Sequence, residues 1–284
     1  MSRALLAAAL LSLSSTGAWA QEAPIQAPTT EDAAPEDWTL TRVPDKNTVV
    51  ATMDFTSGLA LLARCQAGVY DLVVGGLPDA PANKPTRELA IQVGEDAEPD
   101  TTVWTVGSNP SVAFSRIPAI VARRLSEGGK LQVIVPADTP GGPRTRYVMD
   151  VDPSSQAIAE TLTACGRPIV DAREERADQI EGNGQDGLPP AVTWRTMPRP
   201  SFPESVRGRS PRLGYVTLSC VTEDDGGLTD CVTESEQPGG YNLGLAVQRS
   251  LPRARLKLTE EAAADGRPLG GRLITFTVNF RMEG

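Results

Sequence analysis

Short apolar runs separated by turn residues dominate the chain from Trp38 to Cys165. Their length and their enrichment in Val and Ile predict strands, and their regular spacing is typical of a sandwich or barrel. Two helices are predicted among them, one opened by Pro118 and one with Ser154 as its N-cap. The predicted strands cover residues 49–53, 69–74, 89–93, 103–106, 131–135 and 147–151, and the predicted helices cover 118–126 and 154–164.

The pattern changes after a polar stretch at residues 166–190 that is rich in Gly and Pro toward its end. Beyond it, alternating apolar and polar positions predict strands at 214–222, 228–235 and 271–280, with a helix at 241–251 before the last strand. In that strand Thr275, Thr277 and Asn279 form a polar face, which predicts a half-buried strand. The fold class is therefore α+β, with an antiparallel β-rich, sandwich-like N-terminal domain and a small ββαβ C-terminal domain.

Four cysteines, Cys65, Cys165, Cys220 and Cys231, form an even set for which three pairings are possible. Asp225-Gly226 is typical of a tight hairpin turn, and counting outward from it places Cys220 directly opposite Cys231. Cross-strand Cβ separations of about 4.5–5.5 Å are close to the disulfide range, so this pairing predicts a bond. A redox or metal pair is the alternative, but no basic or histidine neighbour supports one.

The N-terminus has the features of a secretory signal peptide. Arg3 precedes an apolar stretch, and Ala18-Trp19-Ala20 fits the small-x-small cleavage pattern. We expect a mature protein that begins near Gln21 and is exported to a periplasm, where disulfides persist. The alternative is an uncleaved anchor in the inner membrane that faces the periplasm.

Composition excludes several kinds of chemistry. The chain has no histidine, which removes Ser-His-Asp and Cys-His catalysis and imidazole metal sites. Its formal charge of −9 disfavours nucleic acid as a partner. We therefore expect no catalytic residues, no metal and no cofactor. The remaining enzymatic hypothesis is hydrolysis of an envelope polymer by Asp150 and Asp152, which end a predicted strand.

Residues 195–284 resemble the C-terminal domain of TonB, in a two-cysteine form found in some TonB-like proteins. The shared features, in chain order, are the Pro-x-aromatic-Pro entry at Pro200-Ser201-Phe202-Pro203, Gly214-Tyr215-Val216, Asp225-Gly226, Leu228-Thr229-Asp230-Cys231, Gly240-Tyr241-Asn242-Leu243-Gly244, Asp265-Gly266-Arg267-Pro268, and Val278 with Phe280.

The resemblance implies a periplasmic domain that adds a strand from an envelope or outer-membrane protein, such as a TonB-dependent receptor, to its sheet. The expected partner-binding residues are Phe202, Pro203, Arg199, Thr275, Thr277 and Asn279, and further arginines that could attract acidic partners are Arg195, Arg207, Arg209 and Arg212. The chain departs from energy transducers because it lacks their long Pro-rich spacer and, if the signal peptide is cleaved, their membrane helix. A non-enzymatic binding module is the main hypothesis, and an anchored transducer for outer-membrane transport is the alternative.

Residues 38–166 more weakly resemble small exported proteins associated with type VI secretion. The shared features are Arg64-Cys65, Trp104 followed by Phe114, Arg124-Leu125 before Gly128-Gly129, and Leu162 with Cys165. This resemblance fits a Cys65–Cys165 bridge. The expected organisation is a signal peptide at 1–20, a disordered leader at 21–37, a β-rich domain at 38–170, a linker at 171–194 and a TonB-like domain at 195–284.

Overall fold

The computed structural model describes residues 38–94, 99–137, 142–154, 156–176, 188–203 and 213–281. Contacts separate residues 1–35 from one compact unit formed by residues 36–284. The predicted signal peptide and leader lie outside the described residues. The division of the chain into domains stays a prediction, although both described ends of the expected linker carry structure, a 3-10 helix at Glu174–Arg176 and a strand at Val192–Thr196.

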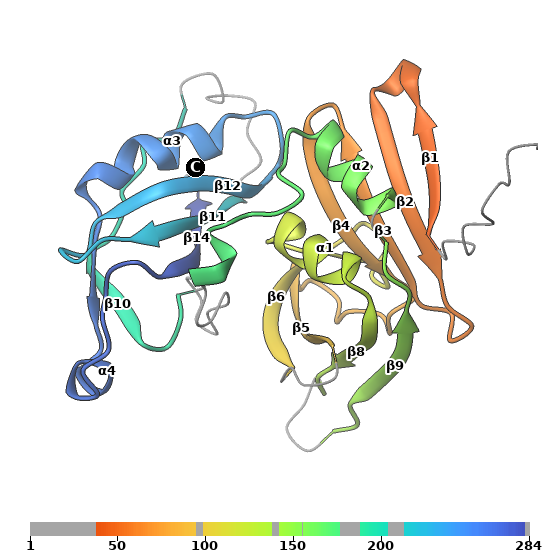
Figure 1. Ribbon diagram of the computed structural model, residues 1–284, viewed down its shortest axis with the longest axis horizontal. Coiled ribbons are helices and arrows are strands. Elements are labelled where there is room, and N and C mark those ends of the chain that lie inside the picture. The colour runs from red at the N-terminus through yellow and green to blue at the C-terminus, as the bar shows by residue number, and fades with distance from the viewer. Residues whose placement is uncertain are drawn as a thin grey trace, which may run out of the picture. The chain divides into compact units, whose positions relative to one another are not determined.

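The N-terminal strands form one antiparallel sheet of nine strands among the described residues, in the order β1-β2-β3-β4-β7-β6-β5-β8-β9 (Figure 1). All six strands expected here are present, and β1, β3 and β7 are additional. Their bounds are β1 Thr39–Val43, β2 Thr48–Asp54, β3 Ala60–Gln66, β4 Val69–Gly75, β5 Thr86–Val93, β6 Asp100–Val106, β7 Ala113–Phe114, β8 Gly129–Val135 and β9 Thr145–Val151, with a 3-10 helix at Pro44–Lys46 after β1.

Two helices pack against this sheet and enclose its core. Helix α1 (Pro118–Ser126) contacts β4, and α2 (Ala157–Ala164) contacts β2 and β3. Fully buried side chains such as Trp104, Ile120 and Leu162 come from both layers. The α+β class with a β-rich N-terminal part is confirmed, and the described strands of this part belong to one hydrogen-bonded sheet. Its core contains residues from both ends of the sheet and from both helices. Ser154 is not the N-cap of α2, because the helix begins after Gln156.

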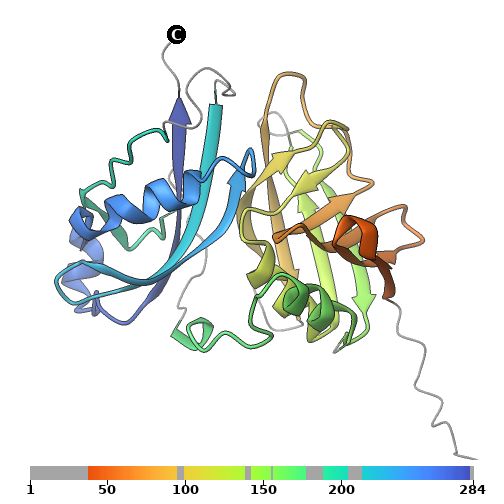
Figure 2. The same cartoon turned by 90° about the horizontal axis from the view of Figure 1, so that it is seen from above.

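The C-terminal part contains the expected ββαβ order within a larger set of elements. Strands β11 (Leu213–Thr222), β12 (Leu228–Gln237) and β14 (Leu273–Arg281) form a three-stranded sheet in the order β12-β11-β14. Helix α3 (Leu243–Ser250) lies across one face of this sheet (Figure 2) and buries Leu243 and Val247 against it. The unexpected elements are β10 (Val192–Thr196), its partner β13 (Arg255–Leu258), a 3-10 helix at Leu251–Arg253 and α4 (Glu260–Ala264).

The hairpin between β11 and β12 differs from the expected two-residue turn. Glu223 N–H donates to Gly227 O at 2.9 Å, so the loop spans five residues and Thr222 faces Leu228, not Thr229. Asp230 then adopts a left-handed φ of 47° and forms a bulge that adds one residue to β12. Beyond the bulge Ser219 faces Val232, which is the pairing that the count from the turn predicts. The Cys220–Cys231 bond is present between these positions, as expected, and Cys65 is bonded to Cys165.

Candidate functional site

Strand β14 forms one edge of the three-stranded sheet, since its only strand partner among the described residues is β11. Thr222 N–H donates to Arg272 O at 2.9 Å, which shows that Thr222 directs its backbone toward β14. Backbone direction alternates along an antiparallel pair. The register Leu218↔Phe276 and Val216↔Val278 therefore places the backbone of Thr277, Asn279 and Arg281 toward the outer edge.

The two faces of β14 are both largely covered. Phe276 and Phe280 point into the core beneath α3, whereas Thr277 shares a hydrogen bond of 2.9 Å with Thr217 on the opposite face. The sequence predicted a half-exposed polar face, but Thr275 and Thr277 are only 4% and 9% exposed. The polar face of β14 is therefore buried along most of its length.

Tyr215 is the main contact between this polar face and the N-terminal part. Its hydroxyl accepts a hydrogen bond of 2.7 Å from Thr105 of β6, and the guanidinium of Arg116 lies 4.2 Å from its ring centroid. Ser235 Oγ also donates to Arg116 O at 2.7 Å. Burial raises the pKa of Tyr215, so the neutral hydroxyl of this residue is retained well above neutral pH.

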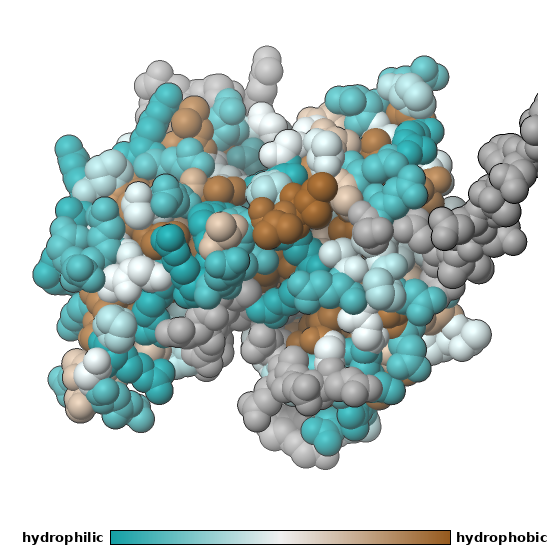
Figure 3. All heavy atoms as spheres, viewed as in Figure 1, coloured by the Kyte–Doolittle hydropathy of each residue, from teal (hydrophilic) through white to brown (hydrophobic). Residues whose placement is uncertain are grey.

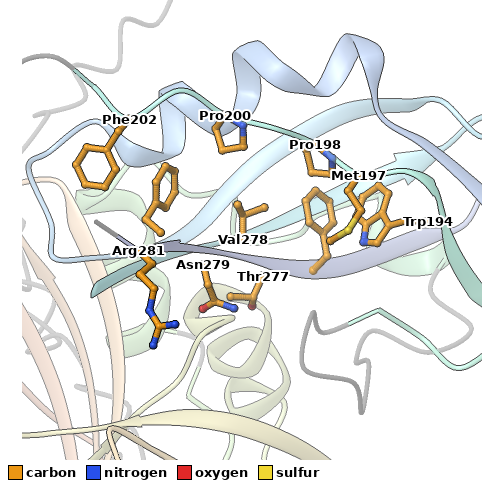
Figure 4. Close-up of a pocket in the computed structure, with 11 residues that line it drawn as sticks. Trp194, Met197, Pro198, Pro200, Phe202, Thr277, Val278, Asn279 and Arg281 are labelled. Atoms are coloured by element: carbon orange, nitrogen blue, oxygen red, sulfur yellow. The ribbon is translucent and has the colours of Figure 1, made fainter. Parts of the chain in front are cut away.

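An extended segment at residues 197–203, which we call the strap, follows β10 and runs alongside β14 (Figure 4). The sequence Met-Pro-Arg-Pro-Ser-Phe-Pro explains why it does not add to the sheet, since prolines lack the N–H that a strand ladder requires. Aromatic pairs hold the chain at both ends of the strap: Trp194 packs edge-on against Phe276 at 5.2 Å, and Phe202 against Phe280 at 5.5 Å.

A groove of about 710 Å³ lies between the strap and β14. Figure 4 shows the apolar side chains of the strap on one side of β14, with Thr277, Asn279 and Arg281 on the other. The lining residues are Trp194, Met197, Pro198, Pro200, Phe202 and residues 276–281. An apolar wall beside an outward-facing row of backbone groups suits an extended peptide.

Three of the six expected partner-binding residues, Phe202, Thr277 and Asn279, line this groove. Arg199 is exposed on the strap, Pro203 is half-buried at its end, and Thr275 is buried, and none of these three lines the groove. Arg207, Arg209 and Arg212 lie outside the described residues. Sequence reasoning missed Trp194 and Arg281, although the alternation of apolar and polar residues at Val192–Thr196 was a signal for β10.

Among the described residues, six large apolar side chains are exposed. On the face seen in Figure 3, hydrophobic residues form small groups among mostly hydrophilic ones. Met197, which is 56% exposed, is the exposed apolar residue that also lines the groove. Its flexible thioether side chain can adapt to different guest side chains.

The opposite edge of the sheet, along β12, is covered by arginine side chains. Thr233 faces Leu218 and directs its backbone away from β11, and its carbonyl accepts a hydrogen bond of 2.6 Å from Arg167 Nη2. Arg173 Nη1 donates to Asp230 O at 2.7 Å. Two register shifts make β12 irregular, whereas β14 pairs with β11 without interruption over nine residues.

These arginines belong to a partly buried cluster of balanced charge that also contains Arg123, Asp171, Glu174 and Glu234. Hydrogen bonds from Arg173 lower the pKa of Asp171, whereas burial raises the pKa of Glu174 despite its bonds from Arg123. The Glu234 side chain, 1% exposed, lies 3.9 Å from Arg167 and 3.8 Å from Arg173 and accepts a bond from Ser219. A pocket of about 140 Å³ adjoins the cluster.

The described residues offer little else with chemical character. They contain no group of three or more metal-ligating side chains placed to hold an ion. Asp150, from the carboxylate pair considered above, is 85% exposed and pairs with Lys130 at 3.2 Å, and Asp152 is exposed. Among the same residues, no helix has the length and apolar character needed to cross a membrane.

Comparison with known proteins gives a weak resemblance. No protein-family model matches the chain, and no curated protein matches it. Among solved structures, it matches the solution NMR structure of the Pseudomonas aeruginosa TonB C-terminal domain, with 18% sequence identity and a TM-score of 0.27. That match covers 36% of this chain and 93% of the other.

Proposed function

We propose that this protein is a non-enzymatic binding module of the cell envelope that accepts an extended segment of another envelope or outer-membrane protein at β14. The guest segment would occupy the groove beside the strap and continue the sheet beyond Thr277, Asn279 and Arg281. The observation that carries the proposal is the uninterrupted edge of β14 next to a groove of about 710 Å³.

The physical requirements of strand addition support this choice of edge. Main-chain hydrogen bonds supply affinity, and pockets for alternate side chains supply selectivity. Backbone groups of β14 meet the first requirement, and the apolar wall of Trp194, Met197 and Phe202 meets the second. Arg281, at the end of the groove, favours an acidic residue at the corresponding end of the guest.

The two disulfides support a location outside the cytosol, because such bonds persist in oxidising compartments. The Cys220–Cys231 bond also stabilises the sheet that carries the site, because it ties β11 to β12. Strand β14 lies on the other side of β11, and its outer edge has no strand partner among the described residues. A periplasmic location and an outer-membrane partner such as a TonB-dependent receptor are part of the proposal.

The test is a substitution that closes the edge while keeping the sheet. Asn279 directs its N–H outward and is exposed, so Asn279→Pro removes a donor that the β11–β14 pairing does not use. Asn279→Ala keeps the N–H and is the matched control. Each full-length variant is immobilised and exposed to a detergent extract of bacterial envelopes, and the retained proteins are identified by mass spectrometry.

We expect one or a few envelope proteins to be retained by the wild type and by Asn279→Ala but lost with Asn279→Pro. Hydrogen exchange on the complex should show new protection of the Thr277, Asn279 and Arg281 amides. Thermal unfolding checks that the proline variant stays folded. If a folded Asn279→Pro variant retains the same proteins as the wild type, strand addition at β14 is wrong.

A further inference from the structure

The side chains that cover β12 come from residues 167–174, which we call the edge clamp. This segment is fixed to the N-terminal part at several points. The Cys165–Cys65 disulfide ties its start to β3, and Arg123 of α1 donates to Pro168 O at 3.1 Å. Arg123 Nε also donates to Glu174 at 2.8 Å, which ties the end of the clamp to the same helix.

From this fixed position the clamp presents two guanidinium groups to β12. Arg173 is held by hydrogen bonds of 2.6–3.1 Å to both carboxylate oxygens of Asp171, and it reaches the carbonyl of Asp230. Arg167 reaches the carbonyl of Thr233, which the register with Leu218 directs outward. An edge carbonyl that already accepts a hydrogen bond from a guanidinium group is not free to accept one from the backbone of a guest strand.

Glu234 completes the arrangement from the side of the sheet. Its buried carboxylate lies between the two guanidinium groups, and such a charge is costly to bury without its partners. The sheet therefore contributes an anion that holds the clamp in place.

We infer that the edge clamp confines strand addition to β14 and keeps the protein from polymerising. A sheet that was open at both edges would let the β14 edge of one copy pair with the β12 edge of the next. Such a head-to-tail contact does not close on itself and produces open chains. This inference rests on the proposed use of β14 as the receiving edge. The partner that an uncovered β12 edge would meet is the β14 edge of a second copy of this protein.

The test removes both guanidinium donors of the clamp together with the buried carboxylate that lies between them. The full-length variant Arg167→Met/Arg173→Met/Glu234→Gln keeps the aliphatic stems but loses the donors and the carboxylate. The matched control, Arg42→Met/Arg64→Met/Glu160→Gln, makes the same change of charge. Its arginines pair with Glu160 of α2 and Asp71 of β4.

Sedimentation velocity across a wide range of concentration is the measurement. We expect the control to remain monomeric and the clamp variant to form oligomers of at least about twice the monomer mass that grow with concentration. Adding Asn279→Pro to the clamp variant should return it to a monomer, because it closes the edge that β12 would meet.

Two results would overturn the inference: a folded clamp variant that stays monomeric, or oligomers that persist after Asn279→Pro. Circular dichroism reports whether the clamp variant folds. If it does not, the charge-neutral variant Arg167→Met/Arg173→Met/Asp171→Asn/Glu234→Gln, which also removes the carboxylate that Arg173 would otherwise leave without its bonds, decides between the same outcomes. Failure of this inference can be told apart from failure of the proposed function. The proposed function is tested by partner capture on chains whose clamp is intact, whereas this inference is tested by the oligomeric state of the clamp variant.

Discussion

The two disulfides should stabilise this protein by different amounts, because they close loops of very different length. Cys65 and Cys165 are separated by 100 residues and Cys220 and Cys231 by 11. The chain-entropy relation assigns about 4.7 kcal/mol to the longer loop and about 2.8 kcal/mol to the shorter one at 25 °C. Removing the long-loop bond should therefore cost about 2 kcal/mol more than removing the hairpin bond.

The comparison requires paired replacements, Cys65→Ala/Cys165→Ala and Cys220→Ala/Cys231→Ala. Alanine is chosen because Cys65 and Cys220 are buried, and a serine hydroxyl at either position would need a new hydrogen-bond partner. Urea unfolding without reductant is followed by tryptophan fluorescence. Trp104 reports on the first core and Trp194, packed on Phe276, reports on the second.

At an m-value of about 2 kcal/mol per molar urea, the two variants should differ by about 1 M in their unfolding midpoints. The long-loop variant should have the lower unfolding midpoint. If the hairpin variant proves equally or less stable, loop entropy is not the main contribution of these bonds, and the reasoning is refuted.

Two further substitutions test the charge cluster and the strap. Asp171→Asn should lower the free energy of unfolding at pH 7 by about 1.5–3 kcal/mol, since it removes charged hydrogen bonds from Arg173. Because these bonds hold the folded-state pKa of Asp171 below its unfolded value of about 3.9, its contribution is present at neutral pH and is lost as the pH falls through the folded-state pKa. Urea unfolding between pH 3 and 7 should therefore show a flatter acid dependence in the variant, and an unchanged dependence would contradict this account. Phe202→Ala should cost about 1 kcal/mol in thermal or urea unfolding through its lost ring contact with Phe280, and it should weaken partner capture. Arg199→Ala, an exposed change on the same strap, is its control and should leave unfolding unaltered.

Local patterns predicted the regular elements well, because side-chain periodicity and turn residues act within a few positions. The helix at Pro118–Ser126 matches its expected bounds, and the alternation around Phe276 identified β14. The hairpin also followed from the sequence, but its register near the turn did not. Counting from Asp225-Gly226 ignored the bulge at Asp230, which depends on pairing with a neighbouring strand.

The candidate site was only partly predictable for a related reason. Phe202 and Asn279 were expected at the binding surface, and both line the groove. Thr275 was expected there as well, but it is only 4% exposed, because the polar face of the small sheet does not lie open to solvent at this position. Alternation shows which side chains share a face, and it does not show what covers that face.

The sequence by itself determined the strands, the main helices and the hairpin disulfide, since these depend on residues close together in the chain or on one turn. Only the tertiary structure decided which edge of the small sheet stays open. Arg167 and Thr233 are 66 residues apart, and their hydrogen bond exists because a disulfide and a buried helix fix the clamp beside β12. Long-range contacts of this kind depend on how whole elements pack, which no local pattern of polar and apolar residues encodes.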